Sequence, residues 1–217
     1  MGHDQRHVEE LTDHGQGTTR LLLSLLFTDI VGSTRLAAQL GDRDWLRLVE
    51  MHHAKVRELL VRFDGREIDC AGDGFFATFD TATSAIRCGD AIRASVGTLG
   101  LEIRAGLHTA ECELAEGRVR GIAVHTAARL MGFARAGEIL VTATVRDVVA
   151  GSGIHFEDRG SRSLRDVPGV WRLYAVTDGE QTALHPVVIA TRRRGSGSED
   201  IRWRGGLRVA ANARART

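Results

Sequence analysis

Cysteine is scarce in this chain, which has three cysteines among 217 residues and no CxxC pair. An odd number of widely spaced cysteines supports neither a disulfide framework nor a structural zinc site. We therefore expect Cys70, Cys88 and Cys112 to be small buried hydrophobic residues. The chain also lacks HExxH, GxSxG and Walker motifs, which argues against a zinc hydrolase, a serine hydrolase with a nucleophile elbow and a P-loop enzyme.

Long apolar runs are absent as well. The apolar segment Leu21–Phe27 is seven residues long and contains Ser24, whereas a membrane-spanning helix needs roughly 20 apolar residues. Residues 1–20 mix acidic with basic side chains, which does not suit the basic beginning of a secretory signal. We expect no membrane span and a cytoplasmic protein.

Charge is balanced overall but uneven along the chain. The formal net charge of +1 gives no bias toward nucleic acid, and no strand has the aromatic pattern of an RNA-binding sheet, so nucleic acid is not an expected partner. Residues 192–217 carry eight arginines with little apolar surface between them. This pattern is typical of a disordered tail, which suits either a solvated end or contact with an acidic partner.

The composition, 43% hydrophobic and 26% charged, suffices for one sizeable core with tails. We expect a disordered tail at residues 1–17, one domain at 18–177 and a basic, disordered tail at 178–217. Leu21–Phe27 suits a buried strand, because it is a short apolar run bounded by polar residues. This strand opens the domain.

Strand and helix patterns alternate through the rest of the domain. Apolar residues at three-to-four spacing in residues 32–65 predict an amphipathic helix that ends at Gly65. Asp-Gly between two strand-like runs predicts a hairpin at residues 66–80. The later patterns predict, in order, a helix at 81–96, a strand at 101–111, a helix at 121–133, a strand at 138–142, a short helix at 143–151 and a pair of strands at 155–176. This order indicates an α+β fold with a ferredoxin-like βαββαβ core, C-terminal αβαββ elements and a mostly antiparallel sheet with packed helices.

Two aspartates stand at the ends of predicted strands. Asp29 follows the buried first strand, and Asp73 lies in the hairpin, so a βαββ arrangement can bring them side by side. Adjacent carboxylates repel each other, and a bound divalent cation relieves the repulsion. Taken singly, Asp29 also suits the cap of a helix that begins near Ser33, and Asp73 suits an ordinary turn.

Several longer motifs decide between these readings. The segments "FTDIVGST", "AGDGFFATF", "RAGLHTAE", "GIAVHTAARL" and "AGEILVT" occur in an order and near a spacing that resemble the catalytic domain of class III adenylate and guanylate cyclases. The segment "LRDVPGVWRLYAV" is similar to the end of the same module, especially in its bacterial versions. The resemblance covers roughly Arg20 to Thr177.

This resemblance implies a homodimer that converts a nucleoside triphosphate, ATP or GTP, to its 3′,5′-cyclic monophosphate and pyrophosphate. It implies that Asp29, Asp73 and the backbone carbonyl of Ile30 hold two Mg²⁺ or Mn²⁺ ions, one activating the ribose 3′-hydroxyl and the other neutralising the triphosphate. The free N–H groups where a helix begins suit a phosphate. This feature predicts a phosphate cradle at Gly32, Ser33 and Thr34.

The resemblance also implies that the partner subunit completes each site. Arg129 matches the arginine that stabilises charge on the α-phosphate in the transition state, and Arg165 stands where the family usually has a lysine for the outer phosphates. His125 lies one helical turn before Arg129 and replaces an asparagine that orients the ribose. For these arginines the alternative is a surface ion pair without function.

The residues that read the base depart most from the family pattern. Asp69 stands in the position of the adenine-reading lysine, and Arg118 stands in the position of its aspartate partner, so the charges are exchanged. An acid at position 69 resembles guanylate cyclases, which leaves ATP and GTP both open. The altered residues also leave open a catalytically weak or inactive cyclase-like module that acts in dimerisation or signalling. His108 is expected to be a hydrogen-bonded core histidine.

Overall fold

The structure is a computed structural model that describes residues 19–115 and 118–177. The two predicted tails, at 1–17 and 178–217, lie outside the described residues. No helix in the described ranges is long and apolar enough to cross a membrane.

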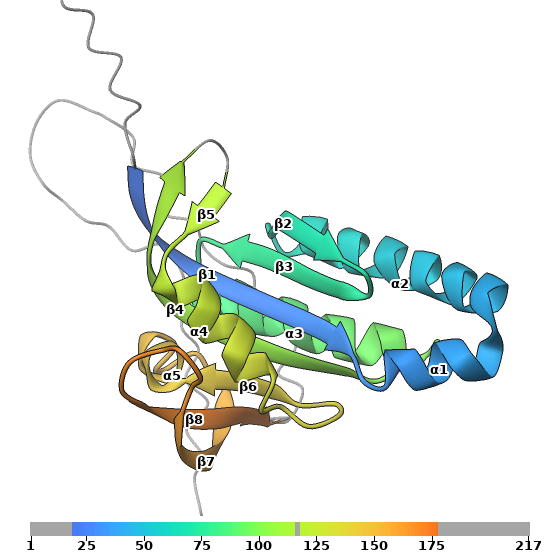
Figure 1. The fold of residues 1–217 in the computed structure, drawn as a ribbon. Helices are drawn as coiled ribbons and strands as arrows, with labels where there is room; N and C mark the ends of the chain where they lie inside the picture. Colours follow the sequence, from blue (N-terminus) through green and yellow to red (C-terminus); the bar gives the residue numbers. More distant parts are fainter. Residues whose placement is uncertain (1–18, 116–117, 178–217) are drawn as a thin grey trace, which may run out of the picture. The chain divides into compact units, whose positions relative to one another are not determined.

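The strands of the described part form one eight-stranded sheet with the order β2-β3-β1-β4-β6-β8-β7, and β5 pairs with β4 off this path (Figure 1). Only β4 and β6 pair in parallel within this sheet, so the predicted, mostly antiparallel α+β fold is confirmed. The strands are β1 (Thr19–Ile30), β2 (Arg66–Ala71), β3 (Gly74–Phe79), β4 (Ile103–Ala115), β5 (Arg118–Arg120), β6 (Ile139–Thr142), β7 (His155–Ser163) and β8 (Val170–Thr177).

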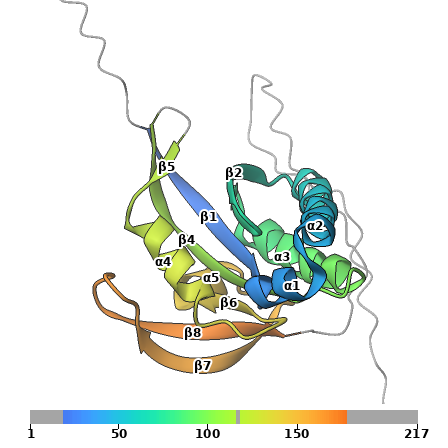
Figure 2. The ribbon, with the colours of Figure 1, turned by 45° about the vertical axis from the view of Figure 1, so that its right-hand side comes forward.

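The helices lie on both faces of the sheet. They are α1 (Ser33–Leu40), α2 (Asp42–Arg62), α3 (Ala82–Gly97), α4 (Ile122–Met131) and α5 (Ala143–Val148). Figures 1 and 2 show α2 and α3 on one face and α4 on the opposite face. The side chains of β1 alternate accordingly: Leu26 and Ile30 join the core beneath α2 and α3, whereas Leu23 and Leu25 join the core beneath α4. The expected buried first strand is thus an interior strand of the sheet, between β3 and β4.

The structure departs from the predicted elements in two places. The helix predicted through residues 32–65 is broken into α1 and α2 at Gly41, whose φ of 78° a helix cannot contain. Asp42 and Asp44 then begin α2 with acidic side chains, which suit the positive end of the helix dipole. The strand β5 was not predicted, because a three-residue strand carries too little periodicity to detect.

A close approach of α4 to the sheet depends on Gly106 in β4. A Cβ atom at this position would lie 2.6 Å from the carbonyl oxygen of Ala127 and would also meet the backbone of Met131. Real Cβ atoms do not approach backbone so closely, so glycine is needed where the helix crosses the strand.

We expect Gly106→Ala to lower the free energy of unfolding by roughly 1 to 3 kcal/mol, because the added methyl group overpacks this crossing. Urea denaturation of the purified protein measures this change. Gly97→Ala is the matched control, since nothing lies within 4 Å of a Cβ at Gly97; it should be neutral or stabilise by up to about 1 kcal/mol. Equal stability of Gly106→Ala and Gly97→Ala would contradict the close approach of α4 to β4 at Gly106.

Two histidines are buried in the cores. His108 contacts Thr142, with 2.9 Å between Nδ1 and Oγ1, and its ring lies edge-on against Trp171. His108 is therefore the expected hydrogen-bonded core histidine. Burial lowers the pKa of His108 from 6.5 to about 4, and burial together with the neighbouring His53 lowers the pKa of His52 to about 4. Among the cysteines, Cys88 and Cys112 are buried as expected, and Cys70 is half-buried.

These lowered pKa values predict acid sensitivity. The unfolded chain binds protons at its histidines near pH 6.5, whereas the folded chain binds them at His52 and His108 only near pH 4. The free energy of unfolding should therefore be at its full value above pH 6.5 and fall as the pH drops toward 4. Urea denaturation at pH 7.5, 6.5 and 5.5 tests this, and His108→Gln should show a shallower slope. If His108→Gln leaves the pH dependence of the free energy of unfolding unchanged, His108 does not cause the acid sensitivity.

Candidate active site

The structure brings Asp29 and Asp73 together at one end of the central strands. Strand β1 pairs with β3 so that Thr28 lies opposite Phe75, and Asp29 and the β2–β3 turn follow at that end. The backbone N–H of Ile30 donates a hydrogen bond to Oδ2 of Asp73 at 3.1 Å. Both side chains are half-buried, and the turn that carries Asp73 lies against the end of β1 next to Asp29.

Gly74 permits this approach. A Cβ at Gly74 would lie 3.2 Å from the carbonyl oxygen of Thr28 and 3.8 Å from Oδ1 of Asp29. A side chain at position 74 would therefore push the turn away from β1. The Asp-Gly pair of the hairpin thus has two roles, since the aspartate supplies the carboxylate and the glycine lets it come close to Asp29.

Arg104 in β4 neutralises Asp29 from the other side. Arg104 lies directly opposite Asp29 in the β1–β4 pairing, and its Nε and Nη2 atoms lie 3.0 Å and 2.6 Å from Oδ2 of Asp29. The sequence analysis did not single out Arg104. The two residues are 75 positions apart, and their contact follows only from the register of two strands.

The donor chemistry suits a hard divalent cation. Asp29 and Asp73 offer carboxylate oxygens, the ligands that Mg²⁺ and Mn²⁺ prefer. Within the described ranges, no group of three or more His, Cys, Asp or Glu residues could hold a metal ion. Mg²⁺ commonly takes only one or two protein carboxylates and completes its shell with water and substrate phosphate, so this pair fits such an ion.

The start of α1 lies directly after Asp29 and Ile30. Gly32 precedes the helix with a left-handed φ of 71°, and no side chain caps the helix. The first backbone N–H groups of a helix have no partner within it, so those of Ser33 and Thr34 suit an anion. The predicted phosphate cradle therefore begins within a few residues of Asp29.

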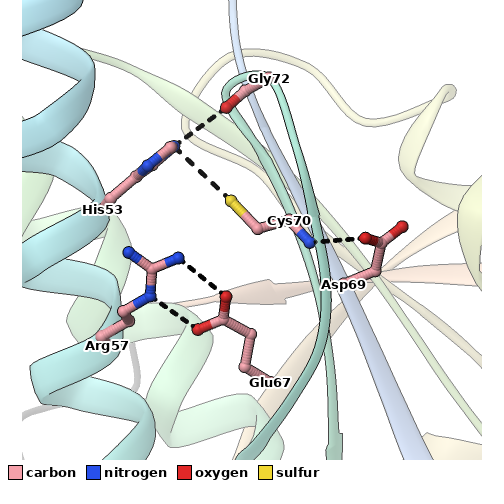
Figure 3. Close-up of polar contacts among 6 residues, drawn as sticks. All are labelled: His53, Arg57, Glu67, Asp69, Cys70 and Gly72. Carbon is pink, nitrogen blue, oxygen red and sulfur yellow. Dashed lines mark hydrogen bonds and ion pairs between the residues drawn. The ribbon is translucent and has the colours of Figure 1, made fainter.

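Side chains of helix α2 contact the β2–β3 hairpin (Figure 3). Nε2 of His53 lies 3.0 Å from the carbonyl oxygen of Gly72, and the His53 ring lies edge-on to Phe75. Farther along the helix, Arg57 forms a two-pronged ion pair with Glu67 of β2, at 2.8 Å and 2.9 Å. These contacts fix the turn that carries Asp73, and the sequence analysis assigned no role to His53.

The two candidate base-reading residues are both exposed. Asp69 lies opposite Phe76 in the β2–β3 pairing, and its Oδ1 accepts a hydrogen bond from the N–H of Cys70 (Figure 3). Phe76 in turn stacks on Phe27 at 4.3 Å between ring centroids. Arg118 lies in β5, and no ion pair joins it to Asp69 between the described residues of one chain. The structure therefore places an aromatic pair beside Asp69 but does not bring Arg118 to it.

The other predicted residues form a separate group around α4. His125 and Arg129 lie one turn apart on this helix, as expected. Nη2 of Arg129 is 3.7 Å from Oδ2 of Asp166, and Nε of Arg165 is 3.4 Å from the same oxygen. Arg129 and Arg165 thus share one carboxylate that the sequence analysis did not single out. Within the described part of one chain, no hydrogen bond or ion pair joins this group to Asp29 or Asp73.

Curated relatives cover much of the chain. A 152-residue match to an uncharacterized protein of Mycobacterium tuberculosis is 29% identical and covers 67% of this chain and 52% of that protein. A putative adenylate cyclase of Rhizobium meliloti is 24% identical over 158 residues, which cover 68% of this chain and 27% of the relative. The chain therefore spans about half the length of the first relative and less of the second.

Solved structures share the fold. The adenylyl cyclase CyaB from P. aeruginosa has a TM-score of 0.71 at 24% identity, covering 76% of this chain and 98% of that chain. The guanylyl cyclase Cya2 has a TM-score of 0.67 at 23% identity, covering 77% of this chain and 98% of that chain. The family model described as the adenylate and guanylate cyclase catalytic domain matches residues 20–178. The match spans well over half of the sequence, and the protein therefore belongs to this family.

Proposed function

We propose that the domain is a nucleotide cyclase that converts ATP or GTP to the 3′,5′-cyclic monophosphate and pyrophosphate, at sites completed by a second copy of the chain. In this reaction the ribose 3′-oxygen forms a bond to the α-phosphorus, and the bond from that phosphorus to the bridging oxygen breaks. Pyrophosphate leaves, and the hydroxyl proton passes to solvent. The observation that carries the proposal is the contact of Asp73 with the end of β1 that carries Asp29, beside a helix N-terminus in a cyclase-family domain.

Asp29 and Asp73 would hold Mg²⁺ or Mn²⁺, together with the carbonyl of Ile30. When bound, such ions supply Lewis acidity that lowers the pKa of the 3′-hydroxyl and neutralises the triphosphate. Asp29 must then loosen its ion pair with Arg104, in which the Arg104 and Asp29 side chains are 36% and 24% exposed, so that solvent screens the pair only in part. The released guanidinium remains at the site as a bidentate donor for phosphate oxygens, and the N–H groups at Ser33 and Thr34 donate to the same phosphates.

Arg129, His125 and Arg165 would come from the partner subunit. Arg129 and Arg165 converge on one anionic group, which suits two guanidiniums that grip a phosphate. His125 lies beside them on α4 and would orient the ribose through a ring nitrogen. The assignment of the two groups to different subunits follows the family resemblance, and no hydrogen bond or ion pair joins them in the described part of one chain.

The charge exchange at Asp69 and Arg118 favours a second candidate. If these residues do not suit either base, the domain acts as a cyclase-like module with weak or no turnover that dimerises or takes part in signalling. The aromatic pair of Phe27 and Phe76 beside Asp69 supports a base-binding surface in either case.

The metal assignment predicts a loss of turnover. Asp29→Asn and Asp73→Asn should each lower Mn²⁺-dependent cyclic nucleotide formation by more than the roughly 10- to 100-fold typical of losing an outer-shell partner. Chromatography of products from ATP and GTP measures the change. Glu58→Gln, which removes an exposed carboxylate from α2, is the control and should retain activity. Near-normal turnover in either aspartate variant would refute the metal assignment.

The shared site predicts complementation. Asp73→Ala and Arg129→Ala chains should each be nearly inactive alone, while their heterodimer contains one intact site of two. An equimolar mixture should recover roughly a quarter of wild-type activity, since half of randomly formed dimers are heterodimers. Asp29→Ala mixed with Asp73→Ala is the matched control and should recover nothing, because both changes affect the same half. Verified heterodimers without recovered activity would argue against a shared site.

Base choice should depend on Asp69 and Arg118. A buried base edge left without a partner costs roughly 1 to 3 kcal/mol, or about tenfold in selectivity and more. If the pair reads guanine, the wild type uses GTP at least as well as ATP, and Asp69→Lys with Arg118→Asp shifts preference to ATP. If Asp69 and Arg118 instead form an ion pair with each other, both nucleotides are poor substrates and the double change raises ATP turnover from near zero. Values of kcat/KM for both nucleotides separate these outcomes, and a wild type selective for ATP with an unchanged double variant would exclude any role in base reading.

A further inference from the structure

The loop between β7 and β8 contains a residue in an unusual backbone conformation. Asp166 has a φ of 61°, and Asp64 is the one other non-glycine residue with a positive φ in the described part of the chain. The N–H of Val167 donates to the carbonyl oxygen of Leu164 at 3.1 Å, which closes a tight turn. Aspartate is among the non-glycine residues that tolerate this conformation, so the turn holds Asp166 at its third position.

The turn is rigidly anchored, so the directions of its polar residues are set. Leu164 and Val167, at its two ends, are 3% and 6% exposed and belong to the buried hydrophobic residues. Arg165 and Asp166 lie between them with side chains 76% and 77% exposed. The backbone therefore presents one cation and one anion to solvent at a fixed place beside α4.

The carboxylate of Asp166 faces both arginines that the proposed function assigns to phosphate. Its Oδ2 atom lies 3.4 Å from Nε of Arg165 and 3.7 Å from Nη2 of Arg129. Among the described residues, no other carboxylate lies within ion-pair distance of either arginine. One oxygen between two guanidiniums is the arrangement that a phosphate oxygen would have.

We propose that Asp166 occupies the anion position of Arg129 and Arg165 and competes there with the substrate triphosphate, so that it sets the affinity of the site for phosphate. This inference rests on the proposed function, which assigns the two arginines to the substrate. The ion pairs are long and exposed, so they contribute little stability and are displaced easily. The displaced carboxylate stays within a few ångströms of the bound phosphate and repels it, so the wild-type site binds triphosphate more weakly than the arginines alone would allow.

If Asp166 competes with phosphate, removing its charge should strengthen phosphate binding. Loss of a purely structural contact would not strengthen it. Asp166→Asn keeps a side chain that tolerates the left-handed conformation and removes the charge. The full-length variant should bind inorganic tripolyphosphate roughly three- to tenfold more tightly than the wild type at about 10 mM salt. Isothermal titration calorimetry without divalent cations measures this affinity independently of turnover. The difference should nearly vanish at about 1 M salt, where the Debye length is about 3 Å.

The matched control is Asp64→Asn. It removes the same charge from the other aspartate with a positive φ, and no arginine forms an ion pair with Asp64 among the described residues, so its affinity for tripolyphosphate should equal that of the wild type. Arg129→Gln and Arg165→Gln should each weaken binding. Thermal unfolding checks that every variant is folded.

The outcomes test the role of Asp166 separately from the assignment of the two arginines to phosphate. If the arginine variants weaken tripolyphosphate binding and Asp166→Asn leaves it unchanged or weaker, Asp166 is a turn residue only and the competition is refuted. If neither arginine variant alters binding, the assignment of these arginines to phosphate fails and the inference fails with it. Tighter binding by Asp166→Asn together with weaker binding by the arginine variants supports both.

Discussion

The pairing of β1 with β3 on one side and with β4 on the other is the constraint on which the candidate site depends. It places Asp29 beside the turn that carries Asp73 and opposite Arg104. A one-residue slip of register would turn Asp29 toward the core beneath α2 and α3. The burial of alternate β1 side chains on both faces opposes such a slip, since Leu25 and Leu26 are both almost fully buried. The hydrophobic core thus fixes the geometry of the charged groups.

Charged side chains of both proposed half-sites form ion pairs within one chain. Arg104 neutralises Asp29, and Asp166 lies between Arg129 and Arg165. All of these side chains are partly or largely exposed, so water and salt weaken the pairs. Binding of a metal–triphosphate complex would therefore exchange partners rather than separate buried charges, whose separation would cost several kcal/mol.

The turn that carries Asp73 depends on packing as much as on its own sequence. Gly74 gives it room against β1, and His53 and Arg57 hold it and β2 against α2 (Figure 3). Metal ligands need such fixed geometry, because a loosely held carboxylate loses conformational entropy when it binds. The long helix α2 therefore serves the site although none of its residues belongs to the predicted active site.

The sequence by itself determined the order of strands and helices, the buried central strand, the Asp-Gly hairpin and the family, because these features follow from local periodicity and from short motifs. It also led to Asp29, Asp73, Arg129 and Arg165, whose surroundings in the chain are distinctive. The break at Gly41 was missed because the apolar stripe continues across it, and β5 because three residues carry no period. Only the tertiary structure showed the contacts made by Arg104, His53 and Asp166. Each acts on a residue distant in the chain or on another element, and such contacts depend on strand register, helix packing and the direction of a turn, none of which a local pattern specifies.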